Sequence, residues 1–483
     1  MTRALPDRPW VPAALLFGIA VALRCWDWGN PVIHVDEQYY LLVGERMLDG
    51  AVPYVDIWDR KPIGLFLLFA GFGLLPGDGI VAYQLAATIA AWGTAVLVTA
   101  GARTIGANLR GGVIAGAVYL IMLSLLGGHG GQTPVFYNLL VAAAGLLVLR
   151  LPECSTRTII ASGAAACLLM GVAIQMKYTP AVEGTFVGLA HGWALLRRGA
   201  RPVKIAAALL LWAAIGVTPT LAAIGWYARA GALDAFWFAN FTSIALRPTY
   251  PIGQVAMRLL GIVAQAAPLI VCAVIGWRGR TATGTLAYAW LLAAVIGFAA
   301  IGTFFDHYAL PLLGPLCIVA GPVLGQSARA IVAVPGLALT LWVVERTTTS
   351  DDAPGARQVA AVVAANSGRE CPYVFIGDTA TYLLSRTCLP TPYAFPNLLA
   401  YATEQGATGI DEAAEVRRIL AARPPVIVTS TRRLSIWNPQ SVRAVKAALA
   451  RDYRLVFTTP RSGWRTAVYL RRDRRYAAPR SPI

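Results

Sequence analysis

The amino-acid sequence predicts a polytopic α-helical membrane protein with a small α/β domain at its C-terminal end. Hydrophobic residues make up 57% of the 483 residues, charged residues make up only 13%, and the mean hydropathy is +0.59. Soluble domains are about half apolar and about a quarter charged. Apolar runs of about 20 residues, the length that crosses a bilayer, recur up to Glu345. After Glu345, short apolar runs alternate with helical patterns, which indicates a separate soluble domain.

The apolar runs predict about eleven membrane-spanning helices. The first, at 10–28, could be mistaken for a signal peptide, but Arg24, Cys25 and Asp27 make a poor cleavage site, so we expect an uncleaved span. The other spans are expected at 80–101, 111–127, 134–149, 158–176, 180–196, 204–228, 252–276, 284–303, 308–325 and 329–345.

Basic residues gather in every second connection between the predicted spans. They are Arg3, Arg8, Arg103, Arg110, Arg150, Arg157, Arg197, Arg198, Arg201, Lys204, Arg278, Arg280 and Arg329. Short cytoplasmic connections are enriched in arginine and lysine, so this pattern predicts a cytoplasmic N-terminus. The loop at 29–79 and all residues after 345 then face the periplasm. Orientation signals and contact with anionic membrane lipids explain the net charge of +17 without a nucleic-acid partner.

The exterior loop at 29–79 is the most acidic part of the predicted membrane domain, residues 1–345. Its stretch 33–64 carries Asp36, Glu37, Glu45, Asp49, Asp56 and Asp59. A carboxylate at the edge of a membrane is costly and therefore indicates a functional site, although an ordinary hydrophilic loop is the alternative. Within the loop we expect an amphipathic surface helix at 39–48 and a second short helix at 63–75, which Pro62 would start.

Three further polar features lie at exterior ends of the later spans. A glycine-rich break occupies 127–134, Lys177 ends the fifth span, and His307 joins the ninth span to the tenth. Each has a structural alternative, since Lys177 could extend its amine to the interface and His307 could satisfy a neighbouring carbonyl. All of them lie on the face that carries Asp36, which favours one shared site.

Residues 346–475 are expected to form the soluble α/β domain, followed by a disordered tail at 476–483. Strands are predicted at 373–376, 426–429, 455–458 and 467–470, and helices at 411–421 and 439–450, which indicates a small parallel or mixed sheet. Asn438 before Pro439 is a typical helix start. Because this domain is placed in an oxidising compartment, its two cysteines, Cys371 and Cys388, are predicted to form a disulfide. Two buried free thiols are the alternative.

The membrane domain resembles the GT-C glycosyltransferases, in the bacterial branch related to protein O-mannosyltransferases and the lipid A aminoarabinose transferase. The matching residues are Asp36-Glu37, the stretch from Tyr54 to Pro62, Lys177-Tyr178-Thr179-Pro180, and His307-Tyr308 followed by Pro311. Two departures are Gln132 in place of an acid before Thr133-Pro134, and Ile63 in place of a second proline.

The resemblance implies an inverting transfer of a sugar from a polyprenyl-phosphate donor to a hydroxyl acceptor at the periplasmic face of a bacterial inner membrane. In this hypothesis Asp36 is the general base and Glu37 orients the acceptor or its neighbours. Preorganised donors stabilise the leaving phosphate. We assign that role to Lys61, Lys177, His307 and Tyr308. Candidate contacts to the acceptor or sugar are Tyr39, Tyr40, Asp56, Asp59 and Tyr178.

No metal or other cofactor is inferred, because the sequence lacks zinc-type cysteine or histidine clusters and phosphate-binding glycine motifs. The acceptor is a lipid, a glycan or a protein, and the sequence does not identify it or the sugar. A transporter or flippase of lipid-linked saccharides is the alternative function, with Asp36 and Lys177 as a coupling pair. Transporters often contain internal repeats, and none is evident in this sequence.

Overall fold

The computed structural model describes residues 10–434 and 436–479 and divides the chain into two compact units. The first unit holds most of the long apolar helices, from residues 1–28, 84–223 and 251–347. The second combines 29–83, 224–250 and 348–483. The acidic loop therefore belongs to the same unit as the C-terminal α/β segment. Arg3 and Arg8, used above for orientation, lie outside the described residues.

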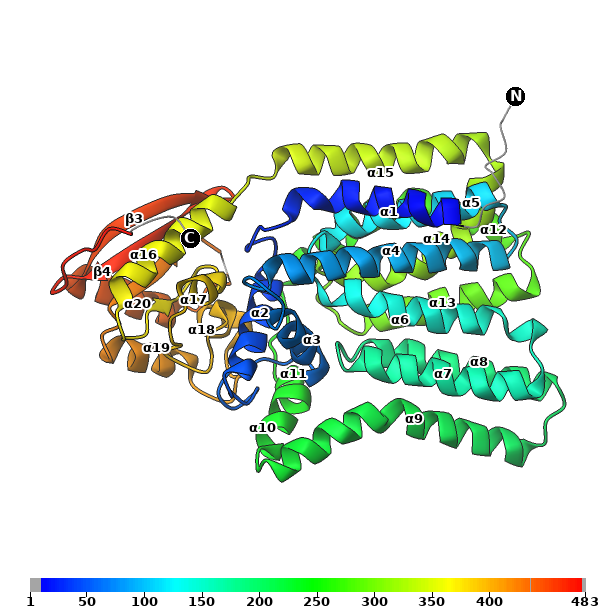
Figure 1. The fold of residues 1–483 in the computed structure, drawn as a ribbon, viewed down its shortest axis with the longest axis horizontal. Coiled ribbons are helices and arrows are strands. Elements are labelled where there is room, and N and C mark those ends of the chain that lie inside the picture. Colours follow the sequence, from blue (N-terminus) through cyan, green and yellow to red (C-terminus); the bar gives the residue numbers. More distant parts are fainter. Residues whose placement is uncertain (1–9, 435, 480–483) are drawn as a thin grey trace. The chain divides into compact units, whose positions relative to one another are not determined.

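The first unit is a bundle of long helices that run side by side (Figure 1). Its helices are α1 (Trp10–Arg24), α4 (Ile80–Thr104), α5 (Leu109–Leu123), α6 (Thr133–Leu149), α7 (Thr156–Ile174), α8 (Pro180–Arg197), α9 (Pro202–Arg229), α12 (Ile252–Trp277), α13 (Ala282–Ala299), α14 (Leu310–Gln326) and α15 (Ala328–Thr348). Within the described residues, all of these except α8 are long and apolar enough to cross a membrane, which makes ten candidate spans. The predicted class of polytopic membrane protein is confirmed.

Helix α8 forms where the sixth span was predicted, but it is not apolar enough to be among the candidate spans. It carries Glu183 and His191, which are both buried. The indole N–H of Trp290 on α13 donates to Glu183 at 2.8 Å, and His191 pairs with Ser162 on α7 at 3.1 Å. Burial of a polar group costs little when it is hydrogen-bonded, so these pairings explain how α8 packs among apolar neighbours.

In the second unit, the acidic loop folds into α2 (Val35–Leu48) and α3 (Ile63–Gly73). The expectation of an amphipathic surface helix at 39–48 is wrong, because every residue from Tyr39 to Gly44 is buried. Helices α2 and α3 pack closely at Gly44, where an added Cβ would lie 2.5 Å from the backbone nitrogen of Ala70. Helix α3 has 11 residues and is too short to span a bilayer.

The C-terminal segment contains a mixed four-stranded sheet in the order β1-β2-β4-β3. Its strands are β1 (Tyr373–Val374), β2 (Val426–Ser430), β3 (Tyr453–Arg461) and β4 (Trp464–Arg471). Strand β1 is parallel to β2, and the other two pairings are antiparallel. The helices of this segment are α16 (Ala353–Ser367), α17 (Ala380–Ser385), α18 (Pro396–Ala400), α19 (Glu412–Ala421) and α20 (Pro439–Asp452), and the remaining short helices of the unit are α10 (Leu233–Trp237) and α11 (Ser243–Ala245).

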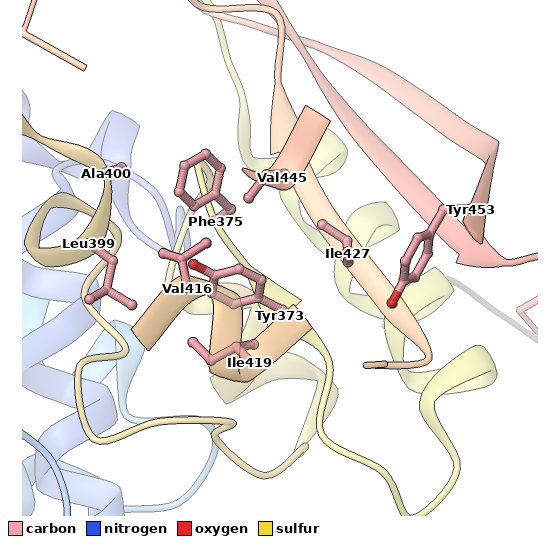
Figure 2. Close-up of a cluster of buried hydrophobic side chains, with 9 residues drawn as sticks. All are labelled: Tyr373, Phe375, Leu399, Ala400, Val416, Ile419, Ile427, Val445 and Tyr453. Carbon is pink, nitrogen blue, oxygen red and sulfur yellow. The ribbon is translucent and has the colours of Figure 1, made fainter. Parts of the chain in front are cut away.

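A hydrophobic core joins the sheet to α18, α19 and α20 (Figure 2). It consists of Tyr373, Phe375, Leu399, Ala400, Val416, Ile419, Ile427, Val445 and Tyr453. The predicted cap of α20 is present, since the Asn438 side chain accepts the N–H groups of Gln440 and Ser441. Of the predicted tail, residues 480–483 lie outside the described residues, and Ala477 exchanges two hydrogen bonds with Asn366.

Candidate functional site

The acidic pair lies in the first turn of α2. His34 caps this helix, and its Nδ1 accepts the backbone N–H of Asp36 at 3.3 Å. The positive end of the helix dipole favours carboxylates at this position. Asp36 is partly exposed, whereas Glu37 is completely buried. Asp36 can therefore meet a substrate, and Glu37 can influence one only through the residues around it.

Two buried tyrosines fix the chain that leads to Lys61. The hydroxyl of Tyr39 donates to the Trp58 carbonyl at 2.8 Å, and that of Tyr54 donates to the Lys61 carbonyl at 2.7 Å. Tyr54 packs against Phe66, among other aromatic rings of the same unit, and has a left-handed backbone conformation with φ of 71°. These bonds hold the backbone of Lys61 at a defined place.

The side chains of His34, Asp36, Asp59 and Lys61 form one electrostatically coupled cluster. Burial lowers the pKa of His34, the charge of Asp36 opposes this shift, and the charge of Lys61 adds to it. Burial raises the pKa of Asp59, while Lys61 and the N–H of Arg60 act in the opposite direction. The Lys61 amine lies 5.5 Å from the centroid of the Tyr40 ring. The cluster thus offers carboxylates and a cation beside each other, as proton removal and anion binding require.

The predicted contact residues of this unit differ in exposure. Tyr39 and Tyr40 are each 1% exposed, so their rings serve as packing groups. Asp56 is exposed, but its carboxylate accepts the N–H of Val52 at 2.7 Å and thereby closes a turn of the loop. Asp59 is partly exposed. Among these four, Asp59 has the position best suited to meet a ligand at the cluster.

In the first unit, Lys177 and the His307-Tyr308 pair come together. Lys177 lies in the bend between α7 and α8, and its amine is 4.1 Å from the centroid of the Tyr308 ring. The ring of His307 packs edge-on against Tyr308 at 4.5 Å. Both aromatic residues belong to the short helical turn Asp306–Ala309 before α14. Tyr178 is partly exposed in the same bend as Lys177.

The glycine-rich break completes this second cluster. Gly127, with φ of 80°, lies against His307. The guanidinium of Arg24, which is 2% exposed, donates to the carbonyls of Gly128 and Gly130 and to the hydroxyl of Thr88. Non-helical backbone at membrane depth needs such internal partners. The three polar segments that were predicted at exterior helix ends, 127–134, 176–180 and 304–308, therefore meet within one unit.

Arg258 also belongs to this cluster, although it was not among the predicted site residues. Its guanidinium lies 3.9 Å from the centroid of the Phe305 ring and donates to the Thr303 carbonyl at 3.1 Å. Arg258 is the only charged residue of the apolar helix α12. A lone charge within a predicted span is itself a functional signal, so the sequence contained the means to find it.

The second unit also contains an ion cluster whose residues were not among the predicted site residues. Glu404 pairs with Arg60 at 2.5 Å and with Arg247 at 2.7 Å. Arg60 also donates to the Ser243 hydroxyl and the Ala407 carbonyl. Glu404 and Arg60 are separated by 344 positions, and no local pattern in the sequence connects them. This cluster anchors the residue that precedes Lys61.

Solved structures resemble the chain, although no protein-family model and no curated protein sequence matches it. The structure of ArnT from Cupriavidus metallidurans bound to undecaprenyl phosphate aligns with a TM-score of 0.64 and 14% identity, covering 94% of this chain and 97% of that one. The apo structure of the same protein aligns with a TM-score of 0.63 and 15% identity, covering 95% and 97%. The chain therefore has the fold of ArnT, and the predicted GT-C architecture is confirmed.

Proposed function

We propose that this protein is an inverting GT-C glycosyltransferase that moves a sugar from a polyprenyl-phosphate donor to a hydroxyl acceptor. The observation that carries the proposal is the likeness, over 94% of the chain, to an ArnT structure that holds undecaprenyl phosphate. The two clusters of carboxylates, cations and aromatic side chains supply the chemistry. A lipid, a glycan or a protein hydroxyl is the acceptor.

In this proposal Asp36 removes the proton of the acceptor hydroxyl. Its partly exposed position at the start of α2 supports contact with a substrate. A positioned carboxylate accelerates such a step by about 10²- to 10⁴-fold. Glu37 is completely buried and would act on Asp36 and its surroundings through its charge. A single displacement by the activated hydroxyl inverts the anomeric carbon.

Lys61, Lys177, His307 and Tyr308 are the proposed phosphate-binding residues. Phosphate leaves with increasing negative charge, and preorganised cations and hydrogen-bond donors stabilise that charge in the transition state. The cation–aromatic contacts of Lys61 with Tyr40 and of Lys177 with Tyr308 restrain both amines in advance. Asp59 and Tyr178 remain the proposed contacts to the sugar or acceptor.

We place the reaction at the periplasmic face of a bacterial inner membrane. The arginine-rich connections support a cytoplasmic N-terminus. The structure joins Cys371 and Cys388 in a disulfide with a Cα–Cα distance of 4.9 Å, the pairing that the sequence analysis expects. Disulfides persist in oxidising compartments, which supports a periplasmic position for the C-terminal segment.

The test is a transfer assay with the purified protein in lipid nanodiscs. A panel of radiolabelled sugars on undecaprenyl phosphate is offered together with total envelope extract as the source of acceptors. The proposal expects label in a product that no longer partitions with the polyprenyl lipid, and less of it with Lys61→Ala. Saturable binding of undecaprenyl phosphate without turnover of any donor, together with movement of intact donor across proteoliposomes, would instead identify a flippase.

A further inference from the structure

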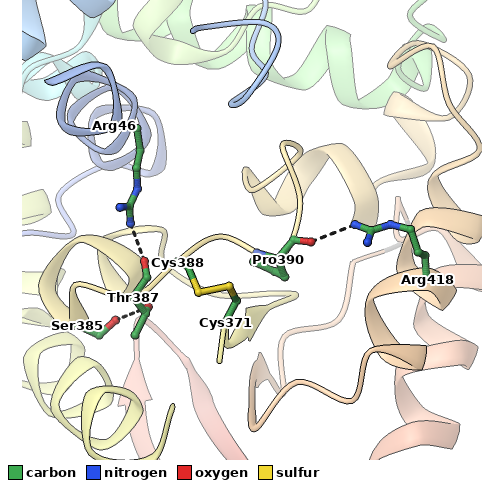
Figure 3. Close-up of a disulfide and its surroundings, with 7 residues drawn as sticks. All are labelled: Arg46, Cys371, Ser385, Thr387, Cys388, Pro390 and Arg418. Carbon is green, nitrogen blue, oxygen red and sulfur yellow. Dashed lines mark hydrogen bonds between the residues drawn. A yellow bond between two sulfur atoms is a disulfide. The ribbon is translucent and has the colours of Figure 1, made fainter. Parts of the chain in front are cut away.

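The disulfide closes a loop that contains Asp378, Ala380 and Thr387, which form hydrogen bonds with α2. Cys371 and Cys388 are 17 positions apart, and the loop between them includes α17 (Figure 3). The hydroxyls of Ser385 and Thr387 pair at 2.8 Å inside it. A cross-linked loop of this size has few alternative conformations, so the groups that it presents are held at defined positions.

Gln38 connects the first turns of α2 to this loop. The residue is 2% exposed and lies two positions after Asp36. Its amide N–H donates to the Asp378 carboxylate at 3.1 Å, and its amide oxygen accepts the backbone N–H of Ala380 at 3.2 Å. A buried amide with a partner on each end resists both rotation and displacement, because either movement would leave a polar group unsatisfied.

Arg46 connects the other end of α2 to the same loop. Its guanidinium donates to the carbonyl of Thr387, the residue before Cys388, at 2.6 Å (Figure 3). The loop thus holds α2 near both ends, at Gln38 and at Arg46. Contacts at two ends of one helix fix both its rotation about its axis and its tilt.

The sheet anchors the loop in turn through Arg461 at the end of β3. The guanidinium of Arg461 donates to both oxygens of Asp378, at 2.9 and 3.0 Å. It also donates to the carbonyl of Val32, just before α2, at 3.2 Å. A fork-like pair of hydrogen bonds from arginine to a carboxylate is strong and directional. A continuous chain of contacts therefore runs from β3 through Arg461, Asp378 and Gln38 to α2.

We propose that the disulfide-closed loop 371–388 positions the catalytic helix α2, with Gln38 and Arg46 as positioning residues for Asp36. This proposal rests on the proposed function, in which Asp36 is the general base. The C-terminal segment is then an integral part of the catalytic machinery, and its contribution appears in turnover and not in substrate binding. A displacement of about 1 Å at a reacting group can lower the rate by about 100-fold.

The variants separate positioning from general stability. Gln38→Leu removes both hydrogen bonds of the amide. Gln38→Glu keeps the bond from the Ala380 N–H and places a second carboxylate against Asp378. The double variant Cys371→Ser/Cys388→Ser opens the loop. Arg46→Met removes the bond to Thr387, and Arg46→Lys restores one donor. Arg418→Met is the matched control, because Arg418 donates to the Pro390 carbonyl just outside the loop and not to α2 (Figure 3).

Two measurements are made on the full chain in nanodiscs. Hydrogen exchange of peptides covering α2 is expected to accelerate at least about tenfold in Gln38→Leu, Arg46→Met and the double serine variant, and to stay unchanged in Arg418→Met. In the transfer assay, kcat is expected to fall by about 10- to 100-fold with KM for the donor within about twofold, and Arg46→Lys is expected to regain most of kcat.

The two proposals fail in different ways. If the wild-type protein transfers no sugar, the proposed function fails, while hydrogen exchange still reports whether the loop holds α2. If the wild type is active and the loop variants keep both wild-type exchange in α2 and wild-type kcat, the positioning role is overturned. The positioning role would also be overturned if Arg418→Met lost as much kcat and as much exchange protection in α2 as the loop variants do, because such equal losses would reflect stability alone.

Discussion

The ion cluster around Glu404 gives the sharpest stability prediction. The Glu404 side chain is 5% exposed and contacts the guanidinium groups of Arg60 at 2.5 Å and Arg247 at 2.7 Å. Burial lowers the pKa of Arg60, and the charge of Glu404 opposes that shift. Glu404→Gln keeps the shape of the side chain but leaves two cations facing each other in a poorly hydrated place.

Breaking a buried ion pair by removing one partner costs about 3–5 kcal/mol. The Arg247 side chain is 30% exposed, so solvent screens part of its charge, and we take the lower end, about 3 kcal/mol. For a folding unit of about 200 residues, each kcal/mol lowers Tm by about 2–4 °C, which gives a decrease of about 6–12 °C. The measurement is a thermal unfolding scan of both proteins in the same detergent.

Glu415→Gln is the matched control for this prediction. Glu415 also pairs with an arginine, Arg418, but the Arg418 side chain is 57% exposed. Exposed pairs contribute less than about 1 kcal/mol, so this variant should lose at most a few degrees. If Glu404→Gln lowers Tm no more than Glu415→Gln does, the buried ion cluster does not hold the loop before Lys61, and the reasoning is refuted.

Two further predictions concern the proposed phosphate-binding lysines and Asp59. Lys61→Ala and Lys177→Ala should each lower donor turnover by at least about tenfold because the leaving phosphate is less compensated, and wild-type steady-state kinetics with the lipid-linked donor for both variants would exclude the phosphate-binding role. Asp59→Asn should raise the apparent Tm at pH 7, because burial raises the pKa of Asp59 and its ionised form therefore costs the folded state free energy. That cost is full above the raised pKa and vanishes as pH falls below about 3.8, so the gain should shrink in scans at progressively lower pH. An unchanged Tm at pH 7 would contradict the assignment.

The membrane helices could be predicted from the sequence because their signal is local. An apolar run of about 20 residues has few alternatives to a span, and α4, predicted at 80–101, forms at Ile80–Thr104. The start of α20 at Pro439 followed from its cap residue Asn438 in the same way. At 180–196, where a span was predicted, helix α8 forms but is not among the candidate spans, and Trp290 donates a hydrogen bond to its buried Glu183.

The environment of the candidate residues could not be predicted, because it depends on contacts between distant positions. Tyr39 and Tyr40 follow Asp36 in the sequence and were predicted to contact the sugar or acceptor, yet both are buried. The ring of Tyr40 packs against Phe69 of α3, and that of Tyr39 packs against Phe395. Likewise, no local pattern reveals that Gln38 meets Asp378, 340 positions later. Arg258 is different, since a lone arginine in an apolar helix was visible in the sequence and was overlooked.

The most direct test of the central claim is transfer by Asp36→Asn. The substitution removes the proposed base at almost constant volume and leaves the cap contact of His34, which uses the backbone N–H of residue 36. Single-turnover transfer from the radiolabelled polyprenyl-phosphate donor is measured beside equilibrium binding of undecaprenyl phosphate. The account predicts a rate lower by about 10²- to 10⁴-fold with binding unchanged within about threefold. A rate above about a tenth of wild type would show that Asp36 is not the base.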